Sequence, residues 1–481
     1  MAESLKQKTV KGVSWSFVEQ ILTRGVNFVI GIILARLLSP TEYGLIGLMA
    51  VFMAISQMFV DGGLSIALIR EKDPSEQDLS TVYIFNLVVS VFFYFLLFFI
   101  APSVADFYDQ PVLTPLMRVL ALTLIIGSFA AVHNILLTIR VDFKTKSIIS
   151  FVTALLSGIA GIICAYKGLG AWALITQLVS ASVLSTLLLL LLVKWRPREG
   201  FSKDSFKRLF GYSSKLLLAD LVIKLYDNAY PLIIGKKFST ASVGQFTQAQ
   251  KYPGIANTTV TSALNRVAFP ILSQLQDDDE RLLSVYEKYI QLSCFVIFPV
   301  LLGLCGCARP FVSLLLTDKW LDCVPLMQIL CFSLLLDGVT NINLNLLYVK
   351  GRSDLVLRLE IVKKILAFSI LFISMFFGLM GMCLGLVVNA YVAFCLNTIY
   401  TKRILNYGLW PQLKVMIPYL LCALIVLAEA LLLSKYISTS WLSLLLSLII
   451  CPVTYWLLAR VTGLYACREI RDMVMSKIRN V

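Results

Sequence analysis

Two basic residues, Arg24 and Lys224, lie near the middle of long apolar segments. A charge at that depth costs roughly 2.5–3.5 kcal/mol on insertion scales, so each one is expected to have a function or a partner. The two residues are equivalent in an internal repeat, and a pseudo-two-fold axis would place them on opposite sides of a central cavity. Two such cations suit an anion with several oxygens, such as a pyrophosphate. Lys251 is the third cation near the middle of a segment and is a candidate for the same role.

Acidic residues accompany Lys224 at helical spacing. Asp220 lies four residues before it and Asp227 three residues after it, so all three share one face of a helix. These carboxylates can hold the lysine charged until an anionic ligand competes for it. An ion cluster that only fixes helix packing is the alternative, and spacing alone does not separate the two. Asp337 is the most central unpaired acid and, with Asp227, is a candidate for coupling to H⁺ or Na⁺.

Amide and hydroxyl side chains gather in the segments that carry Lys251 and Asp337. Lipid-facing surfaces do not carry such groups, so these side chains are expected to face protein or water. Their density suits the hydroxyls of a sugar chain. The sugar-facing candidates are Gln248, Asn257, Asn341 and Asn345.

Other charged and reactive residues have simpler interpretations. Lys363 and Lys364 lie toward the end of a span and can extend to headgroups, and Glu360 is placed to pair with either of them. The single His133 has no nucleophile nearby and is interpreted as a packing or capping residue. The eleven cysteines show no metal-ligand spacing, so no metal site is expected. No nucleotide-binding loop is present, so direct use of ATP is not expected. We predict that the chain has no catalytic site and is not an enzyme.

Membrane-spanning helices must position these residues. Of the 481 residues, 58% are hydrophobic and 15% are charged, and the mean hydropathy is +0.84. A helix needs about 20 apolar residues to cross a hydrocarbon core about 30 Å thick. Fourteen runs reach that length. We therefore predict an all-α polytopic membrane protein with about fourteen transmembrane helices and no water-soluble domain.

The net charge of +14 follows membrane topology rather than affinity for nucleic acid. With a cytoplasmic N-terminus, 27 of the 42 Lys and Arg residues fall on the cytoplasmic side and 7, among them Arg309 and Lys435, on the opposite side. This asymmetry predicts that both termini are cytoplasmic. Anionic headgroups are the expected partners of the basic loops. The polar first residues lack a secretory cleavage site, so the first helix is expected to be retained.

An internal repeat predicts how the helices are grouped. Residues 115–140 match residues 325–350 at an offset of 210, and residues 35–44 match residues 235–244 at an offset of 200. A chance match between leucine-rich segments is the alternative. The repeat predicts two parallel six-helix lobes, followed by an appendage of two helices. The predicted limits are 1–200 for spans one to six, 201–408 for spans seven to twelve, and 409–481 for two further spans and a cytoplasmic tail.

The offset between the two halves rises from 200 in the first matched block to 210 in the second. The second half must therefore contain about ten extra residues before the tenth span. The segment over residues 309–320 fits that insertion, because it is short and apolar in the middle. We predict that it forms an interfacial helix on the outer face.

Two stretches carry a family resemblance. The first comprises Lys11-Gly12-x-x-Trp15 and Leu34-Ala35-Arg36-Leu37-Leu38-Ser39-Pro40-x-Glu42-Tyr43-Gly44, and the second is Gly235-Lys236-x-x-Ser239-x-x-x-Val243-Gly244-x-Phe246-x-x-Ala249. The chain resembles the polysaccharide transporters of the multidrug/oligosaccharidyl-lipid/polysaccharide (MOP) exporter superfamily. Within that superfamily it is most similar to the Wzx-type O-antigen and exopolysaccharide flippases. The resemblance covers the whole chain.

The resemblance implies two six-helix lobes that form a V around a cationic cavity. It implies a bacterial inner-membrane flippase that translocates a lipid-linked oligosaccharide, the repeat unit of lipopolysaccharide O-antigen or exopolysaccharide on undecaprenyl pyrophosphate, by alternating access. Membrane lipids and the glycan polymerase or glycosyltransferase machinery are expected partners, with no cofactor beyond a coupling ion. The last two spans resemble those of the lipid II flippase branch, where two added helices line a groove for the lipid tail. The alternatives are a cation-coupled drug or small-molecule antiporter of the same superfamily and a membrane scaffold without transport activity.

Overall fold

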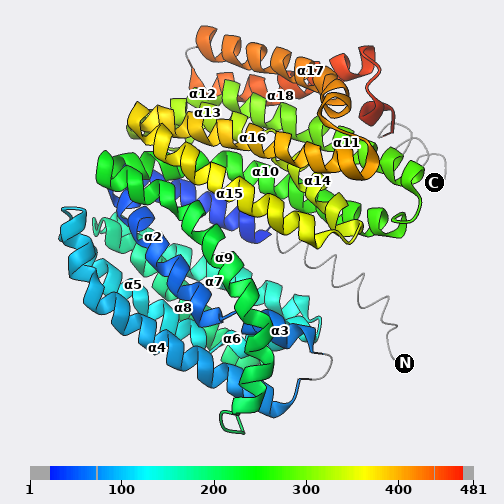
Figure 1. Ribbon diagram of the computed structural model, residues 1–481. Coiled ribbons are helices and arrows are strands. Elements are labelled where there is room, and N and C mark those ends of the chain that lie inside the picture. Colours follow the sequence, from blue (N-terminus) through cyan, green and yellow to red (C-terminus); the bar gives the residue numbers. More distant parts are fainter. Residues whose placement is uncertain (1–21, 72–73, 438, 470–481) are drawn as a thin grey trace, which may run out of the picture. The chain divides into compact units, whose positions relative to one another are not determined.

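The computed structural model describes residues 22–71, 74–437 and 439–469. These residues form helices joined by short loops, and no strand occurs among them (Figure 1). A helix over residues 22–37 comes first. It is followed by α2 (Pro40–Asp61), α3 (Leu64–Arg70), α4 (Glu76–Phe107), α5 (Leu113–Ser128), α6 (Ala131–Ile139), α7 (Phe143–Tyr166), α8 (Ala171–Leu192) and α9 (Lys203–Lys237). The remaining helices are α10 (Thr240–Gln274), α11 (Asp279–Gly306), α12 (Ala308–Leu315), η1 (Asp318–Trp320), α13 (Cys323–Leu334), α14 (Asp337–Val349), α15 (Ser353–Ser374), η2 (Met375–Phe377), α16 (Gly378–Leu405), α17 (Leu409–Tyr436) and α18 (Ser440–Val461).

Most of these helices are suited to a membrane. Within the described residues, nine helical segments are long and apolar enough to cross one, judged by length and composition. The pair α5 and α6 makes a tenth if it is counted as one span that bends by 45°. Polar residues interrupt α9 and α10, which are 35 residues long but are not among the nine. The predicted helical membrane class is confirmed, whereas the total of fourteen spans stays a prediction.

The helix boundaries reproduce the internal repeat. α5 and α6 together cover Leu113–Ile139, and α13 and α14 together cover Cys323–Val349, so the two pairs begin and end 210 residues apart. In both pairs a helix is interrupted near its middle. α7 and α15 also begin 210 residues apart. The repeat predicted at this offset is therefore confirmed at the level of secondary structure.

The chain divides into two compact units, Met1–Gly244 and Gln245–Val481. In the first unit, α9 packs against α2, α3 and α4. Its buried Leu209 belongs to a core that also contains apolar residues of α3, α4, α6 and α8. The Arg208 guanidinium forms an ion pair at 2.6 Å with the buried Asp78 carboxylate of α4. α9 thus packs with helices that precede it, and the lobe limits inferred from the repeat stay a prediction.

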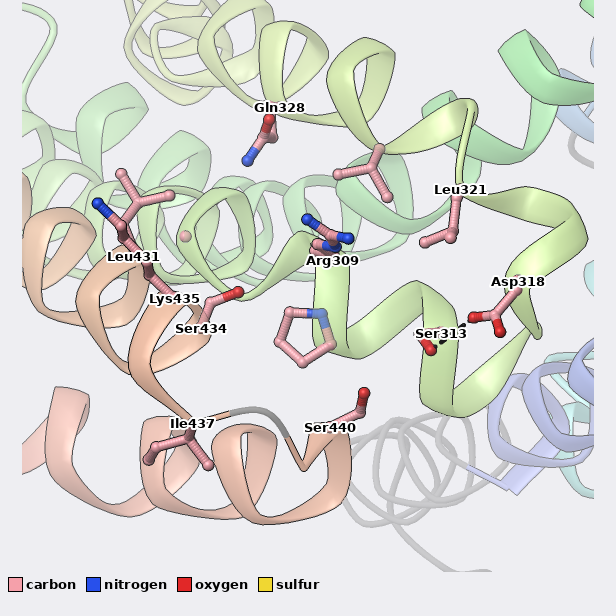
Figure 2. Close-up of a pocket in the computed structure, with 13 residues that line it drawn as sticks. Arg309, Ser313, Asp318, Leu321, Gln328, Leu431, Ser434, Lys435, Ile437 and Ser440 are labelled. Carbon is pink, nitrogen blue, oxygen red and sulfur yellow. Dashed lines mark hydrogen bonds between the residues drawn. The ribbon is translucent and has the colours of Figure 1, made fainter.

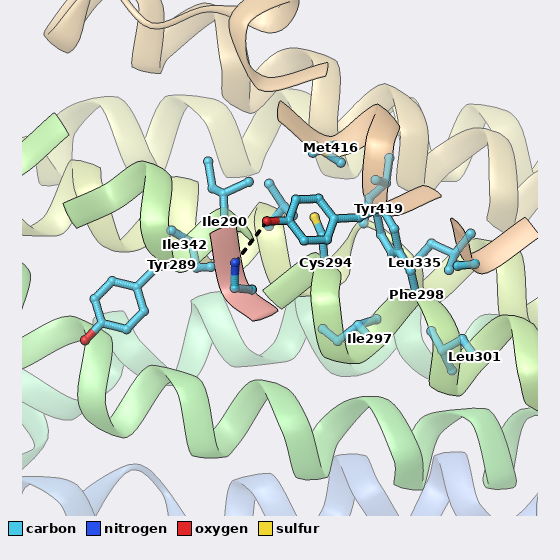
Figure 3. Packing of buried hydrophobic residues seen from close by; sticks show 14 of the residues in the cluster. Tyr289, Ile290, Cys294, Ile297, Phe298, Leu301, Leu335, Ile342, Met416 and Tyr419 are labelled. Carbon is cyan, nitrogen blue, oxygen red and sulfur yellow. Dashed lines mark hydrogen bonds between the residues drawn. The ribbon is translucent and has the colours of Figure 1, made fainter. Parts of the chain in front are cut away.

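α11 provides much of the apolar core of the second unit. Its buried Ile290, Phe298 and Leu301 belong to one cluster with residues of α14, α17 and α18 (Figure 3). The Tyr419 hydroxyl of α17 accepts a hydrogen bond from the backbone N–H of Ala466, which follows α18. α17 and α18 therefore share the core of the second unit.

A buried polar network joins α17 to the same core. The Gln412 side-chain amide donates to the Tyr286 hydroxyl and to the Thr401 hydroxyl, each at 3.1 Å. The Asn343 amide donates to Gln412 Oε1 at 3.1 Å, and the Tyr286 hydroxyl donates to Asn343 Oδ1. All four side chains are buried. Because an unpaired buried polar group costs about 1–3 kcal/mol, this network favours one packing of α11, α14, α16 and α17.

The segment over residues 309–320 is helical, as predicted. It forms most of α12, which starts at Ala308, and the short helix η1. Trp320 is fully buried. Burial of the tryptophan therefore fixes the end of this segment in the protein, and the interfacial position of the segment stays a prediction.

Candidate functional site

The second repeat block forms two equivalent helix starts. The Ser39 hydroxyl accepts a hydrogen bond from the Glu42 N–H at 3.4 Å and caps α2. Ser239 lies directly before α10. Its hydroxyl accepts a hydrogen bond at 3.0 Å from the N–H of Ser242, in the first turn of that helix. A serine that accepts from an N–H in the first turn satisfies a backbone donor which the helix leaves unpaired. Equivalent residues thus start equivalent helices.

These two helix starts also touch each other within the first unit. A β-carbon added to Gly44 would lie 1.8 Å from the Thr240 carbonyl oxygen, and one added to Gly244 would lie 1.9 Å from the Pro40 carbonyl oxygen. Pro40 and Thr240 are equivalent in the repeat, as are the two glycines, so the contact is reciprocal. Only glycine permits backbones to approach this closely. A pseudo-two-fold relation therefore holds locally at these helix starts.

The first unit contains four of the predicted site residues. Arg24 is exposed on the helix over residues 22–37, and Lys224 is half-buried on α9. Asp220 and Asp227 lie one turn away from Lys224, as predicted, but Asp220 and Lys224 form no ion pair in the described part of the chain. That Arg24 and Lys224 form two sides of one anion site stays a prediction.

A further acid belongs to these surroundings. Asp61, at the end of α2, interacts electrostatically with Asp220 of α9 and accepts a hydrogen bond from the Gln57 amide at 3.2 Å. Gly62 and Gly63 follow with φ of 54° and 65°, so the chain turns between α2 and α3 directly beside this acid. Periodicity along one helix could not reveal this pair, because its members lie in different spans.

Asp337 has the most contacts with other candidates in the second unit. It is the first residue of α14, directly after the interruption of the helix pair. The Asn257 amide of α10 donates to the Asp337 carboxylate at 2.6 Å, and the Asn341 amide donates to the Asp337 backbone carbonyl at 2.9 Å. One turn further along, the Asn345 amide donates to Asn265 Oδ1 at 3.0 Å. We call these five residues the α10–α14 seam.

A cation from α15 lies beside this seam. The Lys363 side chain is 12% exposed, and its ammonium lies 2.5 Å from the Glu360 carboxylate. Lys363 also interacts electrostatically with Asp337. The predicted pairing of Glu360 is confirmed. The predicted extension of Lys363 to the headgroups stays a prediction, and in the structure its ammonium is paired with Glu360.

Gln248 and Lys251 lie on α10 but outside the α10–α14 seam. Gln248 is 1% exposed, and its amide has no hydrogen-bond partner among the described residues. The Lys251 ammonium is 5.8 Å from the centre of the Tyr252 ring. A buried amide without a protein partner is costly, so Gln248 stays a candidate for contact with a ligand.

His133 has a structural role. It is 1% exposed, its Nε2 is 3.1 Å from the Trp195 carbonyl oxygen, and its ring packs edge-on against the Trp195 ring. The interpretation of His133 as a packing residue is confirmed. The remaining arrangement offers charges, amides and hydroxyls, which suits binding and the exchange of a proton or cation.

Comparison with known proteins shows a family match. A family model described as "Polysaccharide biosynthesis protein" matches residues 33–325. The lipopolysaccharide biosynthesis protein WzxC of Escherichia coli (strain K12) is 24% identical over 402 residues, which are 82% of this chain and 80% of that protein. The succinoglycan biosynthesis transport protein ExoT of Rhizobium meliloti (strain 1021) is 25% identical over 334 residues, which are 69% of this chain and 68% of that protein.

Two kinds of solved structure share the fold. The lipid II flippase MurJ in an inward closed conformation aligns with a TM-score of 0.72 and 14% identity, over 97% of this chain and 100% of that one. An inward-facing multidrug resistance MATE family transporter of the MOP superfamily aligns with a TM-score of 0.62 and 16% identity, over 80% of this chain and 94% of that one. At these identities the likeness concerns the fold alone.

Proposed function

The chain belongs to the family of polysaccharide biosynthesis proteins, and from this premise we propose that it is a flippase for lipid-linked oligosaccharides. It is a membrane transporter and not an enzyme, like the transport proteins it is related to. The proposed cargo is an O-antigen or exopolysaccharide repeat unit on undecaprenyl pyrophosphate. The cargo moves from the cytoplasmic to the outer leaflet of the bacterial inner membrane by alternating access.

The observation that carries this proposal is the extent of the family match. Residues 33–325 include α2 to α12 and both helix starts of the second repeat block. The match thus covers elements of both halves, including α9 and α10 with their polar residues. WzxC and ExoT, whose names specify lipopolysaccharide biosynthesis and succinoglycan transport, support a glycan as the cargo.

We propose that cationic side chains bind the pyrophosphate of the cargo and that amide side chains bind its sugars. Arg24 and Lys224, with Lys251, are proposed to bind phosphate oxygens, for which charge-assisted hydrogen bonds are well suited. The α10–α14 seam supplies amide donors and acceptors for sugar hydroxyls. Its position at the interruption between α13 and α14 supports this role, because interrupted helices commonly form the binding sites of transporters.

Asp337 is the proposed coupling residue. Its carboxylate accepts a hydrogen bond from Asn257 and interacts electrostatically with Lys363, which pairs with Glu360, so binding of H⁺ or Na⁺ would change the charge balance of these groups. Asp227 is the second candidate for coupling. A change in charge at an interrupted helix would link an ion gradient to the movement of cargo.

The remaining proposals concern the surroundings of the protein. Both termini are placed in the cytoplasm by the positive-inside rule. The glycosyltransferases that build the repeat unit and the polymerase that consumes it are the proposed functional partners. The chemistry of the cargo requires such reactions on the two sides of the membrane.

A complementation experiment tests the proposal. A strain that lacks this protein is complemented with the wild type, with Arg24→Ala/Lys224→Ala, or with Lys167→Ala as a control at an exposed cation of the first unit. The double variant is expected to lose surface glycan and to accumulate lipid-linked oligosaccharide in the cytoplasmic leaflet. Normal surface glycan in the strain with the double variant would contradict the proposed anion site. Normal surface glycan with lost drug resistance in the deletion strain would support the antiporter instead.

A further inference from the structure

A cavity in the second unit is not used by any role assigned above. Its volume is about 830 Å³, within the range of about 300–1,000 Å³ that is typical of small-molecule sites. It lies between α12, the start of α13 and the facing ends of α17 and α18 (Figure 2). Val324 and Leu431 contribute apolar lining, and charged, amide and hydroxyl side chains complete the wall.

The cavity lies where long apolar helices end. Its lining includes Gly306, the last residue of α11, Lys435, near the end of α17, and Ser440, the first residue of α18. The neighbouring Tyr436 and Trp441 are 77% and 57% exposed. Exposed aromatic residues at the ends of spans are typical of the membrane–water interface. The cavity is therefore at the depth of lipid headgroups and, in the topology proposed above, at the outer leaflet.

The charges of the cavity favour an anion. Figure 2 shows Arg309 near its middle, with Lys435 on one side and Asp318 on the other. Neither cation forms an ion pair with a carboxylate in the part of the chain that the structure describes. The Asp318 carboxylate accepts a hydrogen bond from the Ser313 hydroxyl at 2.8 Å. The cavity thus contains two cations, Arg309 and Lys435, and one carboxylate, Asp318, which already accepts a hydrogen bond from Ser313.

The geometry points to a binding site for the phosphate group of a lipid in the outer leaflet. The planar Arg309 guanidinium matches phosphate oxygens, and Lys435 adds a second cation. Gln328 and Ser434 provide neutral hydrogen-bond donors, while Leu431 provides an apolar surface for the first carbons of the lipid chain. Two lipids carry this chemistry at the outer leaflet, an anionic phospholipid and the pyrophosphate-linked product of transport. The second source and the outer orientation rest on the proposed function.

Lipid binding to the purified full-length protein in detergent, measured by native mass spectrometry, tests this site. The probes are phosphatidylglycerol, undecaprenyl pyrophosphate and the phosphate-free diacylglycerol. Arg309→Gln/Lys435→Gln is expected to bind at least one phosphate-bearing probe roughly ten-fold more weakly, with diacylglycerol unchanged. Lys167→Gln, at an exposed cation of the first unit, serves as the control and is expected to bind all three like the wild type.

The two phosphate-bearing probes identify the source. A loss confined to undecaprenyl pyrophosphate assigns the site to the transported lipid, and a loss that includes phosphatidylglycerol assigns it to membrane lipid. Wild-type binding of both by the double variant overturns the site. So does an equal loss in the charge-retaining Lys435→Arg variant, which leaves the Arg309 guanidinium in place, because the effect would then not follow charge. Failure of the wild type to restore surface glycan would overturn the proposed function but leave this result standing.

Discussion

Asp337 occupies a position where one proton changes several contacts. Its carboxylate accepts from the Asn257 amide at 2.6 Å and interacts electrostatically with Lys363, whose ammonium is 2.5 Å from Glu360. The cluster of one cation and two carboxylates has a formal charge of −1 when all three are ionised. Protonation or cation binding at Asp337 would bring that charge to zero. Such a balance suits a residue that alternates between two states.

Replacement of this carboxylate by an amide tests its charge. Asp337→Asn keeps the shape of the side chain and an oxygen for Asn257, but it removes the negative charge. Export of glycan to the surface is expected to fall by roughly ten-fold or more, because a hydrogen bond to a charged group contributes about 1.5–3 kcal/mol. Ser369→Ala, which lies outside the seam and removes only a bond to the Ile365 backbone carbonyl of α15, is expected to keep most activity. Equal export by both variants would contradict a role for the charge.

The sequence predicted the residues of this cluster better than their contacts. The three-residue spacing of Glu360 and Lys363 correctly predicted their pairing within one helix. The same spacing could not show that α15 places Lys363 beside Asp337, because periodicity describes the faces of a helix and not its neighbours. For the same reason the proximity of Asp61 to Asp220 was missed. Contacts within a helix were predictable, and contacts between helices were not.

At the scale of elements, the buried network around Gln412 predicts a stability effect. Gln412→Ala would leave Asn343 and Tyr286 without their buried partner. We expect the free energy of unfolding to fall by about 1–3 kcal/mol, the cost of unpaired buried polar groups. The measurement is thermal unfolding of the purified protein in detergent. Lys414→Ala, an exposed position on the same helix, is the matched control, and an equal melting temperature for both variants would contradict the role of the network.

The reciprocal contact of α2 and α10 makes a second prediction at this scale. In Gly244→Ala, the added methyl group would meet the Pro40 carbonyl oxygen at 1.9 Å, so the helix starts must separate. The distance between spin labels at Thr41 and Ser239, measured by electron paramagnetic resonance, is expected to increase. Export is expected to fall as well. Gly254→Ala is the control on the same helix, because no atom lies within 4 Å of its β-carbon position. An unchanged distance in Gly244→Ala would contradict the tight contact.

At the scale of the whole molecule, the distribution of basic residues predicts the topology. Alkaline phosphatase, which is active only outside the cytoplasm, is expected to be active when fused after Lys167 and inactive when fused after Lys203. The two sites lie on opposite sides of α8, since α8 covers Ala171–Leu192. Fusions at both sites are measured in intact cells, with the amount of each fusion as the control. The reverse pattern would place both termini outside.

The overall architecture was predictable to the extent that it depends on apolar length and on the repeat. Leu113–Ile139 and Cys323–Val349 are equivalent helix pairs whose ends lie 210 residues apart, as the matching prolines and leucines indicated. The packing of α9 with α2, α3 and α4 was not predictable in this way. Equivalence in a repeat identifies which helices correspond, whereas packing depends on side chains of both partners.

The place of α9 in the first unit has a consequence for biosynthesis. Arg208 follows Asp78 by 130 residues, and α9 must be complete before it can cover α2, α3 and α4. At about 5–20 residues per second, the ribosome needs on the order of ten seconds to supply that stretch. During this interval the Asp78 carboxylate lacks its arginine and the core around Leu79 and Val82 is incomplete. The nascent first unit must therefore be kept from misassembly until α9 has been inserted.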